Sequence, residues 1–333
     1  MERRTNLDLH NVLYYNTHLN QIPSPQVFEP AERLDAFRGD RIYLGADHRR
    51  NERRTWLVTG ICAATLAAQV AGGVLFRSMA LTASGLHMAA HVAALLVAAG
   101  AYVLARRHAQ DPRFAFGTGK LGYLAGFANA VVLGITAVLI AVESLKRLLS
   151  PEPVAYDLAL PLAVAGLVVT LVCVWLLKPQ DKDQDLNLSA AHLHLSADAL
   201  VGVLAIAGLA AGWTFGWSWA DPLAGLAGAV LVAQFAYSLI RRAGSALLDM
   251  NPSAELTAEV RARLEAEGER VLDLHLWRLG PGHHAAVAVV SSAHPLGAEA
   301  YHARLKGLSG LSHVTVEVRN PLHDHDHSGH SHF

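Results

Sequence analysis

Two pairs of residues that can bind metal ions lie inside long apolar stretches of the sequence. The first pair is His87 and His91, within SMALTASGLHMAAHVAALLVAAG, and the second is His194 and Asp198, within HLHLSADALVGVLAI. Each pair has i, i+4 spacing, which places both side chains on the same face of one helix. Ionisable groups are costly inside a bilayer, and they usually mark a functional site there. The two pairs therefore predict a four-ligand cation site within the membrane.

The chemistry of these ligands points to a transition metal. Three imidazoles and one carboxylate suit a tetrahedral or similar site for a first-row divalent ion, whereas Ca²⁺ and Mg²⁺ prefer oxygen ligands. The two cysteines, Cys62 and Cys173, lie in apolar runs and indicate neither a disulfide framework nor a thiolate site. Histidine binds metal only when neutral, and its pKa in water is about 6.5. Protons therefore compete with the metal, which predicts cation efflux in exchange for protons.

The elements that must position these ligands are membrane helices. The chain has 333 residues, of which 52% are hydrophobic and only 17% charged. Its formal net charge of −1 gives no basic field for nucleic acid, so we expect no nucleic-acid partner. Six apolar segments each approach the roughly 20 residues that a bilayer requires. They lie at about 55–76, 80–105, 120–147, 154–178, 189–212 and 220–240.

The basic residues between these segments predict the orientation. Most Lys and Arg residues precede the first segment, follow the sixth, or lie in the two-to-three and four-to-five loops. Cytoplasmic loops carry an excess of Lys and Arg, so both termini are expected in the cytoplasm. The N-terminal stretch MERRTNLDLHNVLYYNTHLN has no apolar core, and we therefore expect no cleavable signal peptide.

The composition changes after Pro252. AELTAEVRARLEAEGE has the pattern of an amphipathic helix, while VLDLHLWRLG and HHAAVAVVSS alternate like two strands. A second helix and a third strand complete an αββαβ order, as in ferredoxin-like domains. The predicted organisation is a cytoplasmic N-terminal tail at 1–54, a six-helix transmembrane domain at 55–248, a cytoplasmic αββαβ domain at 252–320 and a His-rich tail at 321–333.

Two other classes of protein deserve comparison with a transporter. The spacing HMAAH is similar to the zinc-protease pattern HExxH, but Met88 occupies the position of the glutamate that acts as general base. An intramembrane metalloenzyme therefore lacks a visible base. A membrane-bound metal sensor would need no paired ligands in the bilayer. Both alternatives fit the ligand pairs less well than a transporter does.

The motifs together resemble those of a known family. From NERRTW at 51 to VTVEVRN at 320, the chain resembles the cation diffusion facilitators. SMALTASGLHMAAHVAAL is similar to their second helix and HLHLSADAL to their fifth, while WADPLAGL and DLHLW are similar to the sixth helix and the cytoplasmic domain. The resemblance implies a homodimer with a transport site on helices two and five. By position, that site falls on His87, His91, His194 and Asp198.

The resemblance also bears on which metal is carried. Many zinc members have Asp where this chain has His91, and this difference, with NERRTW and DPRFAFGTGK, resembles the cobalt/nickel-efflux branch. Imidazole is a ligand that Co²⁺ and Ni²⁺ accept well. We therefore expect efflux of Co²⁺ or Ni²⁺ in exchange for protons, with Zn²⁺ or Cd²⁺ efflux by the same mechanism as the alternative.

Histidines outside the membrane segments either bind additional metal ions or have no role in metal binding. Two positions that hold regulatory metal in the cytoplasmic domain of zinc members are Leu272 and Val289 here. His108 and Asp111 form either a weak accessory site or part of a solvated loop. The remaining domain and tail histidines are either metal ligands or residues with no such role: His275, His283, His284, His313, His323, His325, His327, His330 and His332.

We therefore expect a transporter of the bacterial inner (plasma) membrane rather than an enzyme. It needs no resident cofactor, because the metal ion is its cargo. Its expected partners are metal ions, protons, the lipid bilayer and a second copy of the chain.

Overall fold

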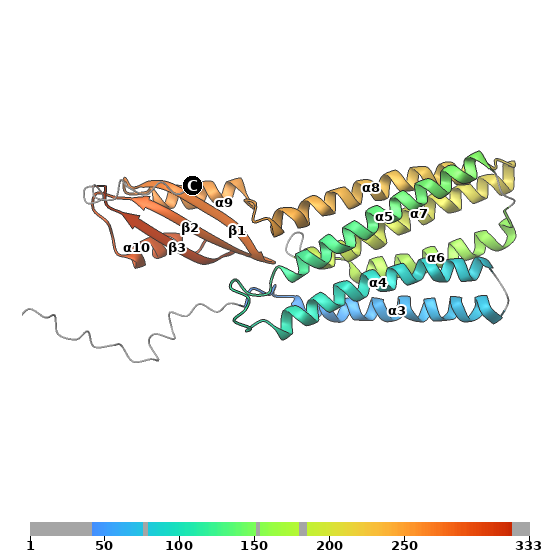
Figure 1. The fold of residues 1–333 in the computed structure, drawn as a ribbon, viewed down its shortest axis with the longest axis horizontal. Coiled ribbons are helices and arrows are strands. Elements are labelled where there is room, and N and C mark those ends of the chain that lie inside the picture. The colour runs from blue at the N-terminus through green and yellow to red at the C-terminus, as the bar shows by residue number, and fades with distance from the viewer. Residues whose placement is uncertain (1–41, 76–78, 151–153, 180–184, 322–333) are drawn as a thin grey trace, which may run out of the picture. The chain divides into compact units, whose positions relative to one another are not determined.

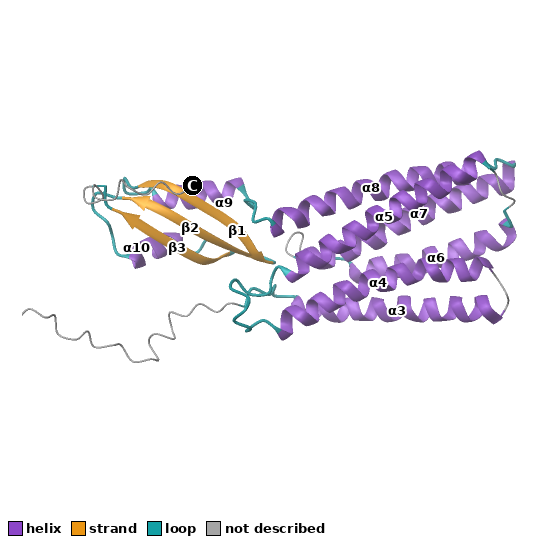
Figure 2. Cartoon of the chain, in the orientation of Figure 1, coloured by secondary structure: helices purple, strands orange, loops and turns teal. Residues whose placement is uncertain are grey.

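Six long helices are followed by a small domain of strands and helices (Figure 1, Figure 2). The structure is a computed structural model that describes residues 42–75, 79–150, 154–179 and 185–321. Within α4, the side chains of 79–84, 86 and 87 lie outside this description. The arrangement confirms the predicted fold class of a six-helix membrane protein with a small αββαβ domain.

The helices have the length and composition of membrane spans. Among the described residues, six helices are long and apolar enough to cross a bilayer. Large apolar side chains on them are well exposed, such as Val138 at 62% and Leu139 at 63%, which suits contact with lipid better than contact with water. The six are α3 His48–Leu75, α4 Met79–Arg107, α5 Leu121–Leu149, α6 Tyr156–Leu177, α7 Leu186–Phe215 and α8 Ala220–Leu247.

The first helix begins earlier than its apolar sequence suggests. The hydropathy pattern predicts a tail through residue 54, whereas α3 begins at His48. Arginine and glutamate are good helix formers, so the basic run before the apolar segment continues the helix. Asn51 and Thr55 are also buried within the bundle, at 6% and 0% exposure. The polar start of α3 is therefore part of the packed structure.

α7 lies between two packed groups of helices. One core cluster joins α3, α4, α6 and α7 through residues such as Val58, Leu95 and Leu195. Another joins α5, α7 and α8. Small residues allow the close approach, because a Cβ on Gly225 of α8 would collide with the Ser144 hydroxyl of α5. Residues on the α4-facing side of α7 are consequently shielded from lipid.

The C-terminal domain has the predicted αββαβ order. Strand β1 pairs antiparallel with β2, and β2 pairs parallel with β3, so the sheet order is β1-β2-β3. Its apolar core includes Val260, Leu264, Val290 and Tyr301. The His-rich tail, from residue 322 onward, lies outside the described residues. The elements are α9 Ala254–Leu264, β1 Arg270–Gly280, β2 His283–Ser291, α10 Ala298–Leu305 and β3 Leu311–Arg319.

The loop before α5 packs closely against the turn between β1 and β2. A Cβ on Gly119 would collide with the Leu279 carbonyl and lie 2.7 Å from the Tyr43 carbonyl. Lys120, which precedes α5, forms an ion pair with Asp249, which follows α8. Both contacts lie at the end of the bundle where α3, α5 and α7 begin and α8 ends. We call this end the domain-side end.

Candidate metal centre

α4, the second of the six described membrane helices, carries the first predicted pair. α4 contains both His87 and His91, one turn apart. His91 points into the bundle and is only 4% exposed. The side chain of His87 lies outside the described residues, so the structure does not test its orientation.

The second pair lies on α7, also one turn apart. His194 is 6% exposed, and the Asp198 side chain is 21% exposed. Both residues precede the glycine-rich half of α7, which contains Gly202, Gly208 and Gly212. The buried position of His194 follows from its place on the face of α7 that meets α4.

The structure brings three of the four predicted ligands into direct contact. His91 Nδ1 lies 3.1 Å from His194 Nε2, and the two rings meet nearly edge to face, at 88°. His91 Nε2 lies 3.2 Å from Asp198 Oδ2. An ionised carboxylate only accepts hydrogen bonds, so a neutral His91 donates from Nε2 and accepts at Nδ1 from His194. We call His91, His194 and Asp198 the buried triad.

The buried triad forms a chain of polar contacts. Among the described residues, no group of three or more His, Cys, Asp or Glu side chains is arranged to hold a metal ion. Within the triad, the two ring nitrogens of His91 face two different partners. One imidazole gives one nitrogen to a given ion, so an ion held by all three groups would need the His91 ring to turn. That turn would replace one hydrogen bond of the His91 ring with a bond from a His91 nitrogen to the metal.

Two polar residues on other helices lie near the triad: one contacts Asp198, and the other contacts the backbone of α4. Thr170 of α6 lies with its hydroxyl 3.5 Å from Asp198 Oδ2, while it donates to the Gly166 carbonyl at 3.0 Å. Asn129 of α5 donates to the Ala94 carbonyl of α4 at 3.3 Å. Asn129 thus fastens α5 to α4 close to His91. Thr170 had no signal in the sequence, because threonine is common in membrane helices.

A family comparison adds to this geometry. The cation efflux transmembrane domain matches residues 55–248 of the chain. The chain belongs to the cation efflux family. This confirms the resemblance to the cation diffusion facilitators, and the protein is a membrane transporter for the efflux of divalent metal cations rather than an enzyme.

Individual members of the cation efflux family align over most of the chain. The zinc transporter ZitB of Escherichia coli is 36% identical over 234 residues, covering 69% of this chain and 74% of ZitB. The cadmium, cobalt and zinc/H(+)-K(+) antiporter of Bacillus subtilis is 28% identical, covering 86% and 95%. The metal cation efflux system protein CzcD of Cupriavidus metallidurans is 30% identical, covering 72% and 77%. These relatives do not single out the cobalt/nickel branch that the sequence suggested.

His108 and Asp111, for which an accessory site and a solvated loop were the two interpretations, have other partners in the loop after α4. Asp111 accepts hydrogen bonds from Arg113, the shortest at 2.7 Å, and these bonds lower the pKa of the Asp111 carboxyl to about 2. His108 Nδ1 bonds to the Leu104 carbonyl at 3.1 Å. A guanidinium therefore already neutralises the carboxylate that a cation would need.

The histidines of the C-terminal domain each have their own contacts. His283 Nδ1 lies 2.7 Å from Ser312 Oγ, and His284 Nδ1 lies 3.3 Å from the Gly310 carbonyl. Burial lowers the pKa of His284, and the nearby Arg278 lowers it further. His275 is exposed and pairs with Asp273 at 2.8 Å, so it is not a packed strand residue. These contacts support ordinary structural roles.

Proposed function

We propose that this transporter exports Zn²⁺, with Cd²⁺ and Co²⁺ as further cargo, in exchange for protons. The contact of His91 with both His194 and Asp198 carries the proposal. In water-poor surroundings these groups need either a proton or a cation between them. A zinc ion accepts imidazole and carboxylate ligands in a tetrahedral shell. The names of the relatives favour zinc, cadmium and cobalt over nickel as cargo.

In this proposal, His87, His91, His194 and Asp198 bind the transported ion. Turning of the His91 ring releases one of its nitrogens to the metal and breaks one contact of the buried triad. Loading therefore displaces protons, and reprotonation on a more acidic side expels the ion. The protons move in the direction opposite to the metal, so that a proton gradient drives export.

The imidazole at position 91 favours a second candidate set of transported ions, Co²⁺ and Ni²⁺. An imidazole at this position makes the ligand set less negative than a carboxylate would, and Co²⁺ and Ni²⁺ accept nitrogen ligands readily. Ni²⁺ is thus the ion that separates the two candidates. The zinc proposal predicts that Ni²⁺ is carried more slowly than Zn²⁺, whereas the cobalt/nickel hypothesis predicts the reverse order.

The proposal also includes the membrane arrangement. Both termini and the C-terminal domain lie in the cytoplasm, because the basic residues gather at the domain-side end. Arg49, Arg50, Arg106 and Arg107 are examples of these. The chain works as a homodimer in the inner membrane. The domain-side end is therefore the side from which the ion enters.

Transport in proteoliposomes tests the cargo. The parent and His91→Asp are compared for uptake of Zn²⁺, Cd²⁺, Co²⁺, Ni²⁺ and Mn²⁺ at equal protein density. We expect Zn²⁺ to rank above Ni²⁺ in the parent, and His91→Asp to lower Co²⁺ uptake relative to Zn²⁺. A parent that prefers Ni²⁺ overturns the zinc assignment, and an unchanged ranking in His91→Asp removes residue 91 as a selectivity position.

A further inference from the structure

A small, partly open space lies between α3, α4 and α7 at the domain-side end. It consists of a cavity of about 60 Å³ and a smaller one of about 20 Å³. Gly45, His48, Asp185 and Pro281 line both cavities. A space of this size holds one or a few water molecules, so it also suits a divalent ion that keeps part of its water shell. We call the two cavities together the vestibule.

His48 lines both cavities of the vestibule. Its Nε2 lies 3.0 Å from the Tyr102 carbonyl oxygen, which only accepts hydrogen bonds. Nε2 therefore carries the proton, and in the neutral ring Nδ1 is the unprotonated nitrogen. An imidazole whose second nitrogen is held by a backbone carbonyl is the usual arrangement of a metal ligand. The backbone of α4 thus fixes His48 in a tautomer that can bind a cation.

Asp185 supplies the negative charge of the vestibule. Of the charged residues that line it, Asp47 and Arg50 pair with each other at 2.9 Å. Among the described residues, the donors to the Asp185 carboxylate are neutral: Asn51 at 2.8 Å, Tyr102 at 2.5 Å and the Leu188 amide at 3.1 Å. These bonds orient the carboxylate without cancelling its charge.

Asn187 provides an independent indication of a ligand. The residue is 1% exposed and lines the smaller cavity. Its Nδ2 donates to the Ala98 carbonyl at 2.8 Å, whereas its buried Oδ1 has no hydrogen-bond partner among the described residues. A buried acceptor without a donor is unfavourable. A cation, or a water molecule on a cation, would satisfy it.

The vestibule and the buried triad lie along one helix–helix contact. Asn187 and His194 are seven residues apart on α7, and Ala98 and His91 are seven apart on α4. Seven residues are two helical turns, so both members of each pair lie on the same face, about 10 Å apart along the helix. The Asn187–Ala98 and His194–His91 contacts are therefore two rungs of the same α4–α7 interface.

We propose that His48 Nδ1, the Asp185 carboxylate and Asn187 Oδ1 form a capture site for a partly hydrated divalent cation, which then moves along α4 and α7 to the buried triad. The inference rests on the proposed function and adds a second binding step to it. One imidazole and two oxygen ligands, with water completing the shell, give a weaker site than the triad. Weak binding suits a site that must pass its ion onward.

Equilibrium binding of radioactive Zn²⁺ to the full chain in nanodiscs tests the site. The background is the Asp198→Asn, His91→Ala double variant, which disables the triad. We expect Zn²⁺ binding to persist in the background, and His48→Ala or Asn187→Leu to weaken it about ten-fold. Asn187→Asp, which adds a carboxylate of similar size, should strengthen it. Asp185→Asn should weaken it while keeping a good N-cap for α7.

His108 offers a matched control for the substitution of His48. His108→Ala removes a histidine near the same end of α4 that bonds to a carbonyl in a similar way and does not line the vestibule, and it should leave Zn²⁺ binding unchanged. Loss of all binding in the background, or equal binding in the His48, Asn187 and control variants, overturns the capture site. A parent that binds Zn²⁺ yet transports none would instead overturn the proposed function alone.

Discussion

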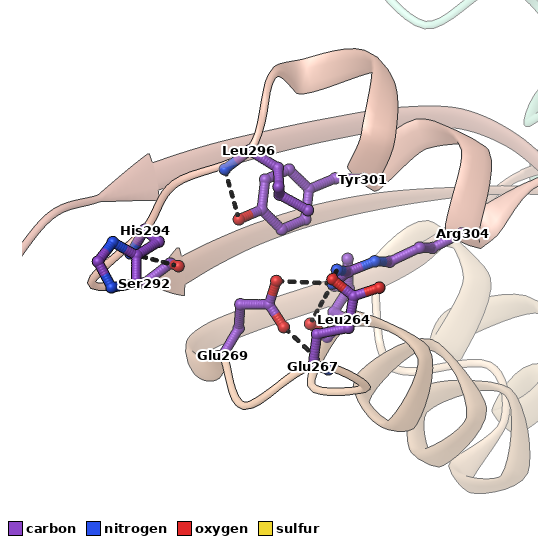
Figure 3. A network of polar contacts seen from close by, with 8 residues as sticks. All are labelled: Leu264, Glu267, Glu269, Ser292, His294, Leu296, Tyr301 and Arg304. Carbon is purple, nitrogen blue, oxygen red and sulfur yellow. Dashed lines mark hydrogen bonds and ion pairs between the residues drawn. The ribbon is translucent and has the colours of Figure 1, made fainter.

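Two buried polar clusters among the described residues, one in the C-terminal domain and one in the membrane helices, differ in how their charges are balanced. In the C-terminal domain, Arg304 bonds to Glu269 at 2.9 Å, to Glu267 at 2.7 Å and to the Leu264 carbonyl (Figure 3). One guanidinium there forms ion pairs with two carboxylates and donates a hydrogen bond to Glu269. The buried triad of the membrane helices has one carboxylate and two imidazoles instead. Its charge depends on protons or on a cation.

The difference separates a structural cluster from a functional one. The Arg304 cluster pairs its carboxylates with a fixed positive charge, so its role is to hold α9, α10 and the start of β1 together. The buried triad is made of groups that bind protons and transition metals in competition. We expect substitutions in the triad to alter transport with little effect on folding, and substitutions at Arg304 to do the opposite.

The largest expected effect is on transport, from Asp198→Asn. Loss of the only carboxylate of the triad should lower the Zn²⁺ transport rate by about 100-fold or more, because even supporting groups around a metal change affinity by 10- to 100-fold. Proteoliposome uptake measures it. Asp157→Asn, which removes an exposed carboxylate at the start of α6, is the control and should transport normally. Equal rates in both variants would contradict a functional triad.

A change in the Arg304 cluster should act on stability instead. Arg304→Met leaves the Glu269 carboxylate, whose side chain is 4% exposed, without its guanidinium partner. Breaking a largely buried charged pair of this kind should destabilise the domain by about 2 kcal/mol. Hydrogen exchange of the β1 and β2 peptides in the full chain measures the change. Glu317→Gln, at an exposed pair with Arg319, should have almost no effect on domain stability. If Arg304→Met and Glu317→Gln changed domain stability equally, the contrast between the Arg304 cluster and the buried triad would be lost.

Acid should weaken the Arg304 cluster. Burial alone would raise the pKa of Glu269. Hydrogen bonds from backbone amides and from Arg304 outweigh burial and hold this pKa below its usual range. A carboxyl with a lowered folded-state pKa stabilises the fold above its unfolded pKa, and that contribution is lost as pH falls through the folded value. Domain stability should therefore decrease below about pH 4.5, the ordinary glutamate range. Glu269→Gln should flatten this decrease; an identical pH profile would show that another group is responsible.

The smallest expected effect is at Thr170. Its hydroxyl is 3.5 Å from Asp198 Oδ2, which is long for a hydrogen bond. Thr170→Val keeps the shape and should reduce Zn²⁺ transport only about two- to three-fold, since such a contact contributes about 0.5 kcal/mol. Thr214→Val, at an exposed position of α7, is the matched control. A loss as large as that of Asp198→Asn would make Thr170 part of the binding site.

Much of the fold was predictable because helix periodicity and apolar length are local properties. The six spans and the αββαβ order agree with the sequence patterns. The boundary at His48 was missed because the start of α3 is polar, and its burial depends on Asn51 contacting Asp185, far away in sequence.

The candidate site was predictable to the extent that its ligands are paired on one helix. The i, i+4 spacing identified His91, His194 and Asp198, and the structure brings these three together. The contacts of Thr170, His48 and Asn187 could not be predicted, because they depend on which helix faces meet. Cys62 and Cys173 illustrate the same limit, since their sulfur atoms lie 3.8 Å apart across α3 and α6.

The central claim is that metal and protons compete for the buried triad. Simultaneous recording of Zn²⁺ uptake and internal pH in proteoliposomes tests it most directly. We predict that Zn²⁺ entry is accompanied by proton exit, that an opposing proton gradient slows it, and that Asp198→Asn abolishes both fluxes together. Zn²⁺ uptake that continues without proton movement, or that is unchanged by Asp198→Asn, would contradict the account.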